Sequence, residues 1–246
     1  MFKAILFLFL ITSTLYGQVT LPTFQAAHIS AASVALGSCG TQNCGGPALC
    51  NDNGDCNSTN VSMRWHSASE NSPDNLVLTK QSGGTTTLSA RTTGDRGWYR
   101  KRSSGNNPNG QHGSSNQNTY TGHYKNQDYY RSFFAWNLAS VAGETITAAQ
   151  IQLDINNWYN TDGGTDAYSK IWEIESTTYA EIITSKDNPR GLEIYDDMGN
   201  GVLYSCLTID KNNMGLYTFQ LSAAAVSKIN SLNGGYFIIG NTVSCE

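Results

Sequence analysis

The sequence predicts an all-β protein, an antiparallel β-sandwich of jelly-roll character with one short helix near the C-terminus. Several segments alternate apolar and polar residues with the period of two that is typical of half-buried strands. Glycine and asparagine turns separate these segments, and the 246 residues include 24 glycines. Only one segment, close to the C-terminus, carries both a start and a stop signal for a helix.

Residues 1–17 predict a secretory signal peptide. Lys3 precedes an apolar run from Ala4 to Ile11, and small and polar residues follow as far as Gly17. The run is shorter than the roughly 20 apolar residues that a membrane-spanning helix needs. We therefore expect cleavage after Gly17 and a secreted, extracellular protein that has no membrane association once the signal is removed.

Residues 18–60 predict a small segment held together by disulfides. An exported chain with six cysteines, an even number, is expected to form three bridges. Zinc binding by thiolates is the alternative, which an oxidising compartment disfavours. Cys206 and Cys245 are predicted to pair with each other. Three connectivities stay open for the other four cysteines, Cys39, Cys44, Cys50 and Cys56.

Residues 61–87 predict a polar linker, with a short strand at the apolar island Leu76–Leu78. Two adjacent N-glycosylation sequons begin just before it, at Asn57 and Asn60. In a eukaryotic secretory pathway a glycan here would mark an exposed stretch, whereas in a bacterium the sequons would have no meaning.

The sandwich domain is expected to cover residues 88–246. Its first strand region ends in the basic pair Lys101 and Arg102, read as a solvated surface pair or, alternatively, as a dibasic processing site. The next residues, 103–119, are rich in Asn, Ser and Gly and predict a long exposed loop.

The stretch "YYRSFFAWNL", Tyr129 to Leu138, predicts a core strand. Strand alternation places Phe134 and Trp136 in the core and directs Arg131 and Asn137 to the surface. Large rings at strand spacing are usually core residues, because burying one stabilises the fold by about 1.5–3 kcal/mol.

Further strands are expected after this one. In "GETITAAQIQLDI" the inward residues are Ala149, Ile151, Leu153 and Ile155. Residues 167–174, 216–221 and 236–243 also predict strands, and "GLEIYDDMGNGVLYSCLTI" predicts a strand, a glycine-rich turn and a second strand. Ser222 is expected to cap the helix "AAAVSKINSL", which Gly234 and Gly235 end.

These motifs also carry a family resemblance. The order "GWY", "YRSFFAWNLASVAGETITAAQIQL", "YSKIWEI", "GNGVLY" and "GGYFIIG" resembles exported bacterial single-domain proteins that have an "RNFFVFDL"-like strand. It is more distantly similar to DNRLRE-type domains of surface proteins, some of which are carbohydrate-binding modules. The resemblance covers about Leu88 to Val243 and implies an extracellular β-sandwich without a catalytic centre. The Cys-rich front segment, Cys206 and Cys245 depart from that pattern.

No catalytic motif is present in the sequence, so we predict no catalytic residue, no cofactor and no enzyme. A metal bound by His112 and His123 is a weak alternative, as is a hydrolase that uses carboxylates such as Asp154 and Glu173. Charged residues make up only 14% of a chain with net charge −4, which argues against nucleic acid as a partner.

Calcium is the one ion that the loops favour. "DNGD" at 52–55 and "DGGTD" at 162–166 group oxygen ligands around glycine turns, so Asp162 and Asp166 are the candidate ligands. The competing interpretation is conformational, since Asp and Asn favour turns whether or not an ion is bound.

The ligand predicted for the sandwich is a glycan or another extracellular polymer. Flat rings with polar edges suit glycan recognition, whereas the alternative is that such rings only cover the ends of the sandwich. Two other functions stay open, a structural matrix protein and a polysaccharide-active hydrolase. The candidate binding rings, all outside the expected core, are Trp98, Tyr99, Tyr120, Tyr124, Trp158 and Tyr159.

Overall fold

The computed structural model describes residues 61–65, 74–90, 94–102, 119–124, 128–160, 166–184, 187–210 and 212–245. The predicted signal peptide, the four N-terminal cysteines, the asparagines of both sequons and the polar loop at 103–118 lie outside these ranges.

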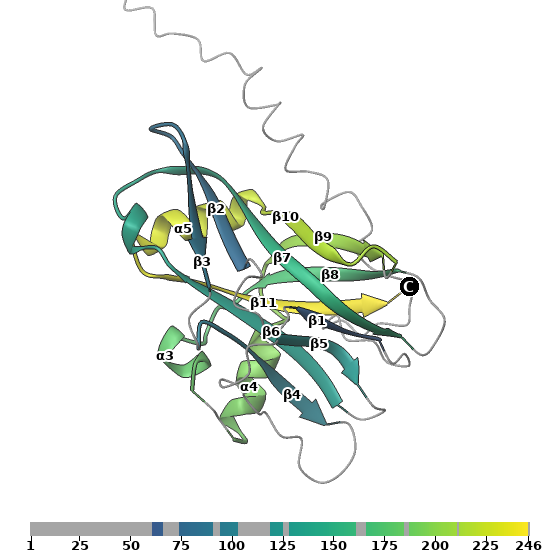
Figure 1. Cartoon of the computed structure of the whole chain (residues 1–246). Helices are drawn as coiled ribbons and strands as arrows, with labels where there is room; N and C mark the ends of the chain where they lie inside the picture. Colours follow the sequence, from purple (N-terminus) through teal and green to yellow (C-terminus); the bar gives the residue numbers. More distant parts are fainter. Residues whose placement is uncertain are drawn as a thin grey trace, which may run out of the picture.

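Eleven antiparallel strands lie in the described ranges (Figure 1). Nine of them follow the path β3-β2-β7-β1-β5-β6-β11-β8-β9, while β10 pairs with β7 and β4 pairs with β6. The strands are β1 (Val61–Trp65), β2 (Asp74–Lys80), β3 (Thr85–Ser89), β4 (Arg96–Arg102), β5 (Thr119–Tyr124), β6 (Asp128–Asn137), β7 (Ile146–Asn160), β8 (Asp166–Glu173), β9 (Leu203–Asp210), β10 (Gly215–Gln220) and β11 (Tyr236–Cys245).

Two long strands, β6 and β7, divide this path into two layers. The first part of β7 lies between β2 and β10, and its second part pairs with β1. The first part of β6 pairs with β5, and its second part pairs with β11. One layer is therefore β3-β2-β7-β10, the other is β4-β6-β11-β8-β9, and β1 with β5 joins them. The predicted all-β antiparallel sandwich is confirmed.

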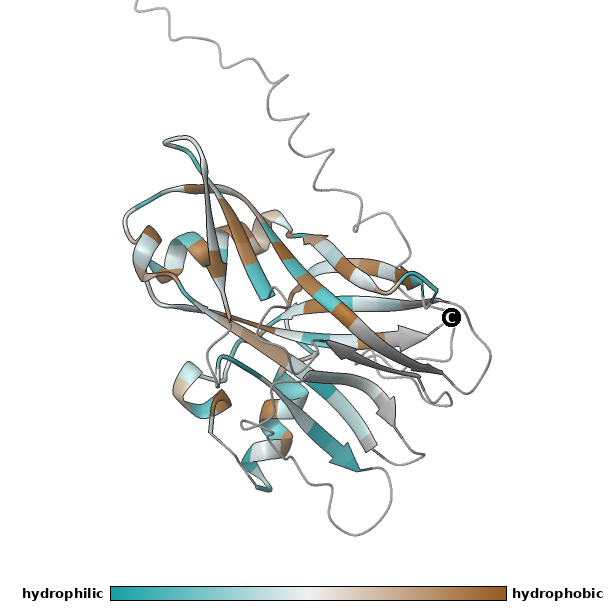
Figure 2. Ribbon diagram, in the orientation of Figure 1, coloured by the Kyte–Doolittle hydropathy of each residue, from teal (hydrophilic) through white to brown (hydrophobic). Residues whose placement is uncertain are grey.

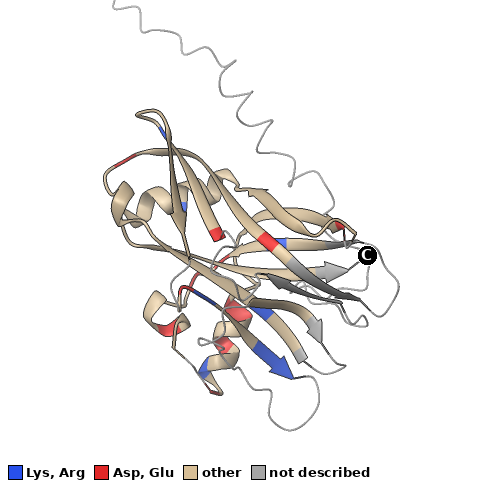
Figure 3. Ribbon diagram, in the orientation of Figure 1, with Lys and Arg blue, Asp and Glu red and all other residues tan. Residues whose placement is uncertain are grey.

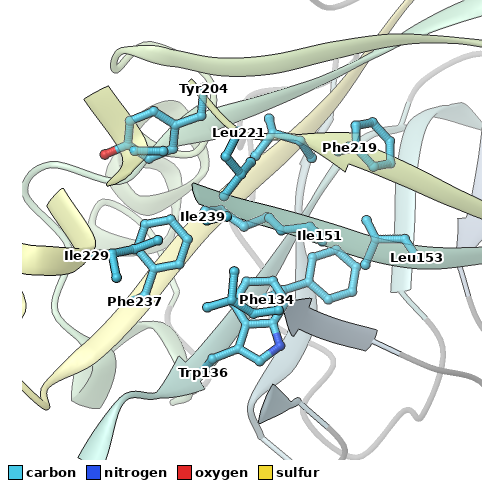
Figure 4. Packing of buried hydrophobic residues seen from close by; sticks show 14 of the residues in the cluster. Phe134, Trp136, Ile151, Leu153, Tyr204, Phe219, Leu221, Ile229, Phe237 and Ile239 are labelled. Atoms are coloured by element: carbon cyan, nitrogen blue, oxygen red, sulfur yellow. The ribbon is translucent and has the colours of Figure 1, made fainter. Parts of the chain in front are cut away.

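The main core fills the space between the two layers. Phe134 and Trp136 are 0% and 1% exposed, as predicted, and the rings of Trp136 and Phe237 stack with centroids 6.2 Å apart. Figure 4 shows these rings facing Ile151 and Leu153 of β7. The predicted inward residues of β7, Ala149, Ile151, Leu153 and Ile155, are all buried.

A buried ion pair connects the two layers. The Arg96 guanidinium in β4 pairs with the Asp74 carboxylate in β2, and the side chains of these residues are 7% and 0% exposed. The Trp136 indole N–H donates to the Asp74 carbonyl at 2.8 Å. Because a buried charge is costly without a partner, this pair fixes the position of β2 over β4.

The sandwich begins before Leu88. Residues 61–87 were predicted to be a linker, yet β1 and β2 both pair with β7, and β3 starts at Thr85. Leu76 and Leu78 are fully buried in the main core. Asn75, Val77 and Thr79 alternate with the buried residues of β2 and are only half-buried, so this polar segment is a strand with one partly exposed face rather than a linker.

Two helices cover the outer face of β4 and β6. They are α3 (Tyr179–Ile182) and α4 (Arg190–Asp197), and Figure 1 shows both on the side of β6 away from β7. Figure 2 shows the brown, apolar positions of α4 next to this sheet. A second hydrophobic core lies between these helices and the sheet. It consists of Tyr99, Phe133, Ile174, Ile182, Ile194, Tyr195 and Met198.

The helix α4 was predicted to be a strand. The segment "LEIY" alternates as a strand does, but Ile194, Tyr195 and Met198 are the residues that are buried. Their spacing is that of one helix face, so packing against β4 decides the structure of a segment whose local pattern fits both states.

Arg131 was predicted to reach solvent but is fully buried. Its guanidinium donates to the carbonyl oxygens of Tyr195 and Asp196 at 2.9 and 3.1 Å, where α4 ends. The alternation of β6 was read correctly, but the helix layer covers the face that was expected to be solvated. Asn137, the other residue predicted to lie at the surface, is exposed.

The edge strand β4 ends in the basic residues Arg100, Lys101 and Arg102, the blue segment of Figure 3. Lys101 is 40% exposed and lies 3.8 Å from the Asp196 carboxylate, and Arg102 is exposed. Charges on an edge strand disfavour pairing with another chain, and the predicted surface location of Lys101 and Arg102 is confirmed.

The helix α5 (Ala223–Leu232) was predicted with its cap. The Ser222 side chain accepts a hydrogen bond from the Ala225 N–H, and Asn233 and Gly234 end the helix with φ of 41° and 91°. A 3-10 helix, η1 (Ala139–Val141), follows β6. None of the helices in the described ranges is long and apolar enough to cross a bilayer.

The predicted disulfide between Cys206 and Cys245 does not fit the register. Cys206 lies opposite Lys170 on one side of β8, and Cys245 lies opposite Ala167 on the other side. Two strand spacings separate them by roughly 10 Å, with a further offset along β8. Since the Cα atoms of a disulfide lie within about 7 Å of each other, this pairing is wrong.

Candidate functional site

Two tyrosines stack at the end of the sandwich where β6 ends and β11 begins. The ring centroids of Tyr179 and Tyr236 are 3.5 Å apart, and the ring planes are inclined by 6°. Tyr179 is the first residue of α3 and Tyr236 the first residue of β11. Both rings are half-buried, so the pair is partly open to solvent.

Tyr179 is held in place by the start of α3. The Thr178 side chain accepts from the Glu181 N–H, and the Glu181 carboxylate accepts from the Thr178 N–H at 2.9 Å, which forms a capping box. The preceding backbone is fixed by the buried Asp197 carboxylate, which accepts from the Thr177 N–H at 2.7 Å. A helix of one turn is therefore oriented by hydrogen bonds at its first residues.

Tyr236 is held in place by the turn after α5. A Cβ at Gly234 would lie 2.9 Å from the Cβ of Ala142, so the turn packs closely on the end of η1. Tyr236 then pairs in register with Asn137 of β6, whose side-chain amide donates to the Tyr236 hydroxyl at 3.4 Å.

Asp95, the residue before β4, supplies the charge of the site. The Tyr179 hydroxyl donates to the Asp95 carboxylate at 2.6 Å. Burial and this hydrogen bond together raise the pKa of Tyr179 above its ordinary value of 10.0. The phenol donates its proton to this hydrogen bond, and a carboxylate can accept a further hydrogen bond through its second oxygen.

The stacked rings line a hollow of about 390 Å³. This volume lies within the range of roughly 300–1,000 Å³ that is typical of small-molecule sites. β3 forms the opposite wall, and the lining combines ring surface with hydroxyl, amide and carboxylate groups. The lining residues are Thr87, Leu88, Ser89, Asp95, Asn137, Tyr179 and Tyr236.

The predicted binding rings of Trp98 and Tyr120 also come together, with Tyr130 as a third member. The Trp98 centroid lies 6.2 Å from that of Tyr120 and 5.1 Å from that of Tyr130, with planes inclined by 80° and 69°. This edge-to-face packing is typical of rings that stabilise one another. None of these three rings lines the hollow beside Tyr179 and Tyr236, so this cluster is a weaker binding candidate than the Tyr179–Tyr236 pair.

Tyr99 is not a surface ring. It is fully buried in the second core, and its hydroxyl lies 3.1 and 3.0 Å from the carbonyl oxygens of Ile182 and Thr184, where α3 ends. Burial raises the pKa of Tyr99 above its ordinary value. The prediction that Tyr99 binds a ligand is wrong, because adjacent strand residues face opposite sides and the Tyr99 side is covered by helices.

The other predicted site residues lie at the limits of the described structure. The side chains of Tyr124, Trp158 and Tyr159 fall outside it, as does all of Asp162. Asp166 begins β8 opposite Asp210, and no group of three metal-ligating side chains occurs among the described residues. Calcium binding thus stays a prediction.

The two carboxylates considered for hydrolysis, Asp154 and Glu173, lie away from the Tyr179–Tyr236 hollow. Glu173 is 15% exposed at its side chain and pairs with Lys228 at 2.8 Å. Asp154 lies on the outer face of β7, opposite Leu216 of β10. Neither residue lines the Tyr179–Tyr236 hollow, so the structure offers no support for the hydrolase alternative at these positions.

Neither Tyr179 nor Tyr236 was predicted to be a binding residue. Tyr236 opens a strand that was predicted to be buried, and Tyr179 lies in a segment for which no element was predicted. The capping box "TYAE", Thr178 to Glu181, was the one local feature that indicated a helix start at Tyr179.

Comparisons with known proteins assign no family to this chain. No protein family model, no curated protein and no solved structure matches it.

Proposed function

We propose that this protein is a secreted, non-enzymatic binding module that recognises a glycan of a cell surface or extracellular polymer. The observation that carries the proposal is the stacked pair Tyr179 and Tyr236, which lines a hollow beside the Asp95 carboxylate and the Asn137 amide. Carbohydrate is the ligand class that uses ring faces and planar polar groups together.

The chemistry of the hollow suits a sugar. The C–H groups of a pyranose ring pack on an aromatic face, and the sugar hydroxyls need nearby acceptors and donors. Asp95 is an acceptor, the Asn137 amide is a donor, and Thr87 and Ser89 can act as both. The two tyrosines lose little rotamer freedom on binding, since their stacked rings already fix each other.

The secreted state belongs to the same proposal. It is supported by the signal-like residues 1–17, by the cysteine-rich segment with Cys39, Cys44, Cys50 and Cys56, and by the sequons at Asn57 and Asn60. The resemblance to exported proteins and to carbohydrate-binding modules points the same way. Disulfides and glycosylation in this front segment would protect an extracellular chain whose binding surface lies at Tyr179 and Tyr236.

The test is a glycan and polysaccharide array probed with the full mature chain and with the variants Tyr179→Ala and Tyr236→Ala. Each variant removes one ring of the pair, and we expect affinity to fall at least tenfold, which corresponds to about 1.4 kcal/mol. Tyr120→Ala is the matched control, since it removes a half-buried tyrosine from the separate Trp98 cluster. Thermal unfolding of every variant shows whether the fold survives.

Specific binding by the wild type, lost in Tyr179→Ala and Tyr236→Ala but kept in Tyr120→Ala, supports the proposal. Absence of wild-type binding to every glycan overturns it. Loss of binding in Tyr120→Ala alone would transfer the site to the Trp98 cluster.

A further inference from the structure

A second hollow shares the stacked tyrosines with the first. Its volume is about 270 Å³, and it lies between the segment that joins β8 to α3 and the last turns of α5. Tyr179 and Tyr236 line this hollow as well as the first one. The other lining residues are Ile174, Glu175, Thr177, Thr178, Lys228, Leu232, Phe237 and Ile238.

We propose that the ligand is an internal segment of a linear, uncharged polysaccharide that lies across both hollows, with the stacked tyrosines between successive sugar units. This inference deepens the proposed function and rests on it. It specifies two properties of the ligand, the length that is recognised and the absence of negative charge.

The length of the recognised ligand follows from the two tyrosines that both hollows share. Because Tyr179 and Tyr236 belong to both hollows, a ligand that contacts the pair in one hollow ends next to the other. A single sugar occupies one hollow and leaves the second one hydrated. A polysaccharide occupies both hollows and gains the additional contacts within the same binding event. Its affinity therefore rises with the number of sugar units.

The charge preference follows from the ionisable groups that line the hollows. Asp95 lines the first hollow and Glu175, which is exposed, lines the second. The one cation in either lining, Lys228, is ion-paired with Glu173 at 2.8 Å. The net charge of the groups that line the two hollows is negative, so these groups would repel a polysaccharide that carries carboxylate or sulfate groups.

The groups that surround the second hollow are compatible with sugar hydroxyls. The Thr178 hydroxyl and the Glu175 carboxylate supply acceptors, and the Lys228 ammonium has three donors, of which the ion pair with Glu173 uses only part. Leu232 and Phe237 add apolar surface to the lining. The first hollow is lined by a similar mixture of polar and apolar groups.

The test uses ladders of cello-, manno-, xylo- and laminari-oligosaccharides of one to six units, with oligogalacturonides as the acidic probe. Isothermal titration of the full mature chain is expected to show affinity for one neutral ladder that rises at least tenfold between the di- and the hexasaccharide, about 1.4 kcal/mol. The variant Glu175→Ala should weaken the hexasaccharide at least threefold and leave the disaccharide unchanged. Leu216→Ala, on the exposed face of β10, is the matched control.

The outcomes separate the two proposals. If neither the ladders nor any array glycan binds, the proposed function fails and this inference fails with it. If a neutral sugar binds at Tyr179 and Tyr236 but the monosaccharide matches the hexasaccharide, or if oligogalacturonides bind more tightly, only the inference is overturned. A Glu175→Ala effect that is equal for the di- and the hexasaccharide also overturns it.

Discussion

The guanidinium of Arg131 lies 4.4 Å from the ring centroid of Tyr195, in the interface between β6 and α4. It also donates to two backbone carbonyls at the end of that helix. Lys101 approaches the same ring at 5.8 Å from the solvent side. A positive charge at the C-terminal end of a helix is favourable, so Arg131 acts as a buried C-terminal cap that fastens α4 to the sheet.

Arg131→Met should destabilise the fold by about 3 kcal/mol or more, because carbonyl oxygens that are buried under α4 would lose their donor. Arg131→Lys should recover less than half of the stability lost in Arg131→Met, since an ammonium cannot reproduce the planar set of N–H donors of a guanidinium. Lys101→Ala is the matched control and should cost less than about 1 kcal/mol, because that cation is exposed. Urea unfolding measures all three, and equal losses for Arg131→Met and Lys101→Ala would contradict the capping role.

The ion pair between Arg96 and Asp74 gives a second prediction. Arg96→Met leaves the Asp74 carboxylate buried without its cation and should cost about 3–5 kcal/mol. The double variant Asp74→Leu with Arg96→Met should be more stable than Arg96→Met alone, since it removes both charges. Chemical denaturation of the two variants tests this, and a double variant that is no more stable than the single one would show that Asp74 acts mainly through other contacts.

The strands of the sandwich were predictable because alternation is a local property. Phe134 and Trp136 on β6, and Ile151 and Leu153 on β7, are all buried as their spacing indicates. The start of α5 was predictable for the same reason, since Ser222 is a capping residue in the sequence itself.

The helix layer was not predictable in this way. Whether the Arg131 side of β6 meets water or a helix depends on α4, which follows much later in the chain and whose pattern also fits a strand. The candidate site has the same limitation. Tyr179 begins α3, Tyr236 begins β11 and Asp95 precedes β4, so only the tertiary arrangement of these segments brings the three residues together.

The hydroxyl of Tyr179 gives a third prediction. Its pKa is raised by burial and by the Asp95 carboxylate, so Asp95→Asn should lower the pKa of Tyr179 toward 10.0. A pH titration followed by NMR of ¹³C-labelled tyrosine measures this. Tyr204 is the internal control, because burial is the largest cause of its raised pKa and Asp95 is not among the causes. A Tyr179 resonance that titrates identically in both proteins would mean that the Asp95 carboxylate does not contribute to its raised pKa.

The capping box at the start of α3 makes the site sensitive to acid. Hydrogen bonding by the Thr178 N–H, followed by that of the Thr178 hydroxyl and by Arg190, lowers the pKa of Glu181 from its ordinary value of 4.5. A carboxyl whose pKa is lowered by folding stabilises the protein above its unfolded pKa and loses this contribution as the pH falls through its folded pKa. Wild-type protein should therefore exceed Glu181→Gln in melting temperature near pH 6, and the difference should shrink below about pH 4.5.

Because Tyr179 is the first residue of α3, the same acidification should weaken the proposed glycan binding in the wild type more than in Glu181→Gln. Differential scanning calorimetry between pH 3 and pH 7 measures the stability, and the array ligand titrated at pH 4 and pH 7 measures the affinity. Arg190→Ala is the companion variant, since its guanidinium bonds Glu181 at 2.9 Å and its loss should raise the pH at which the difference disappears. A melting-temperature difference that stays constant across the whole range would exclude Glu181 as the titrating group.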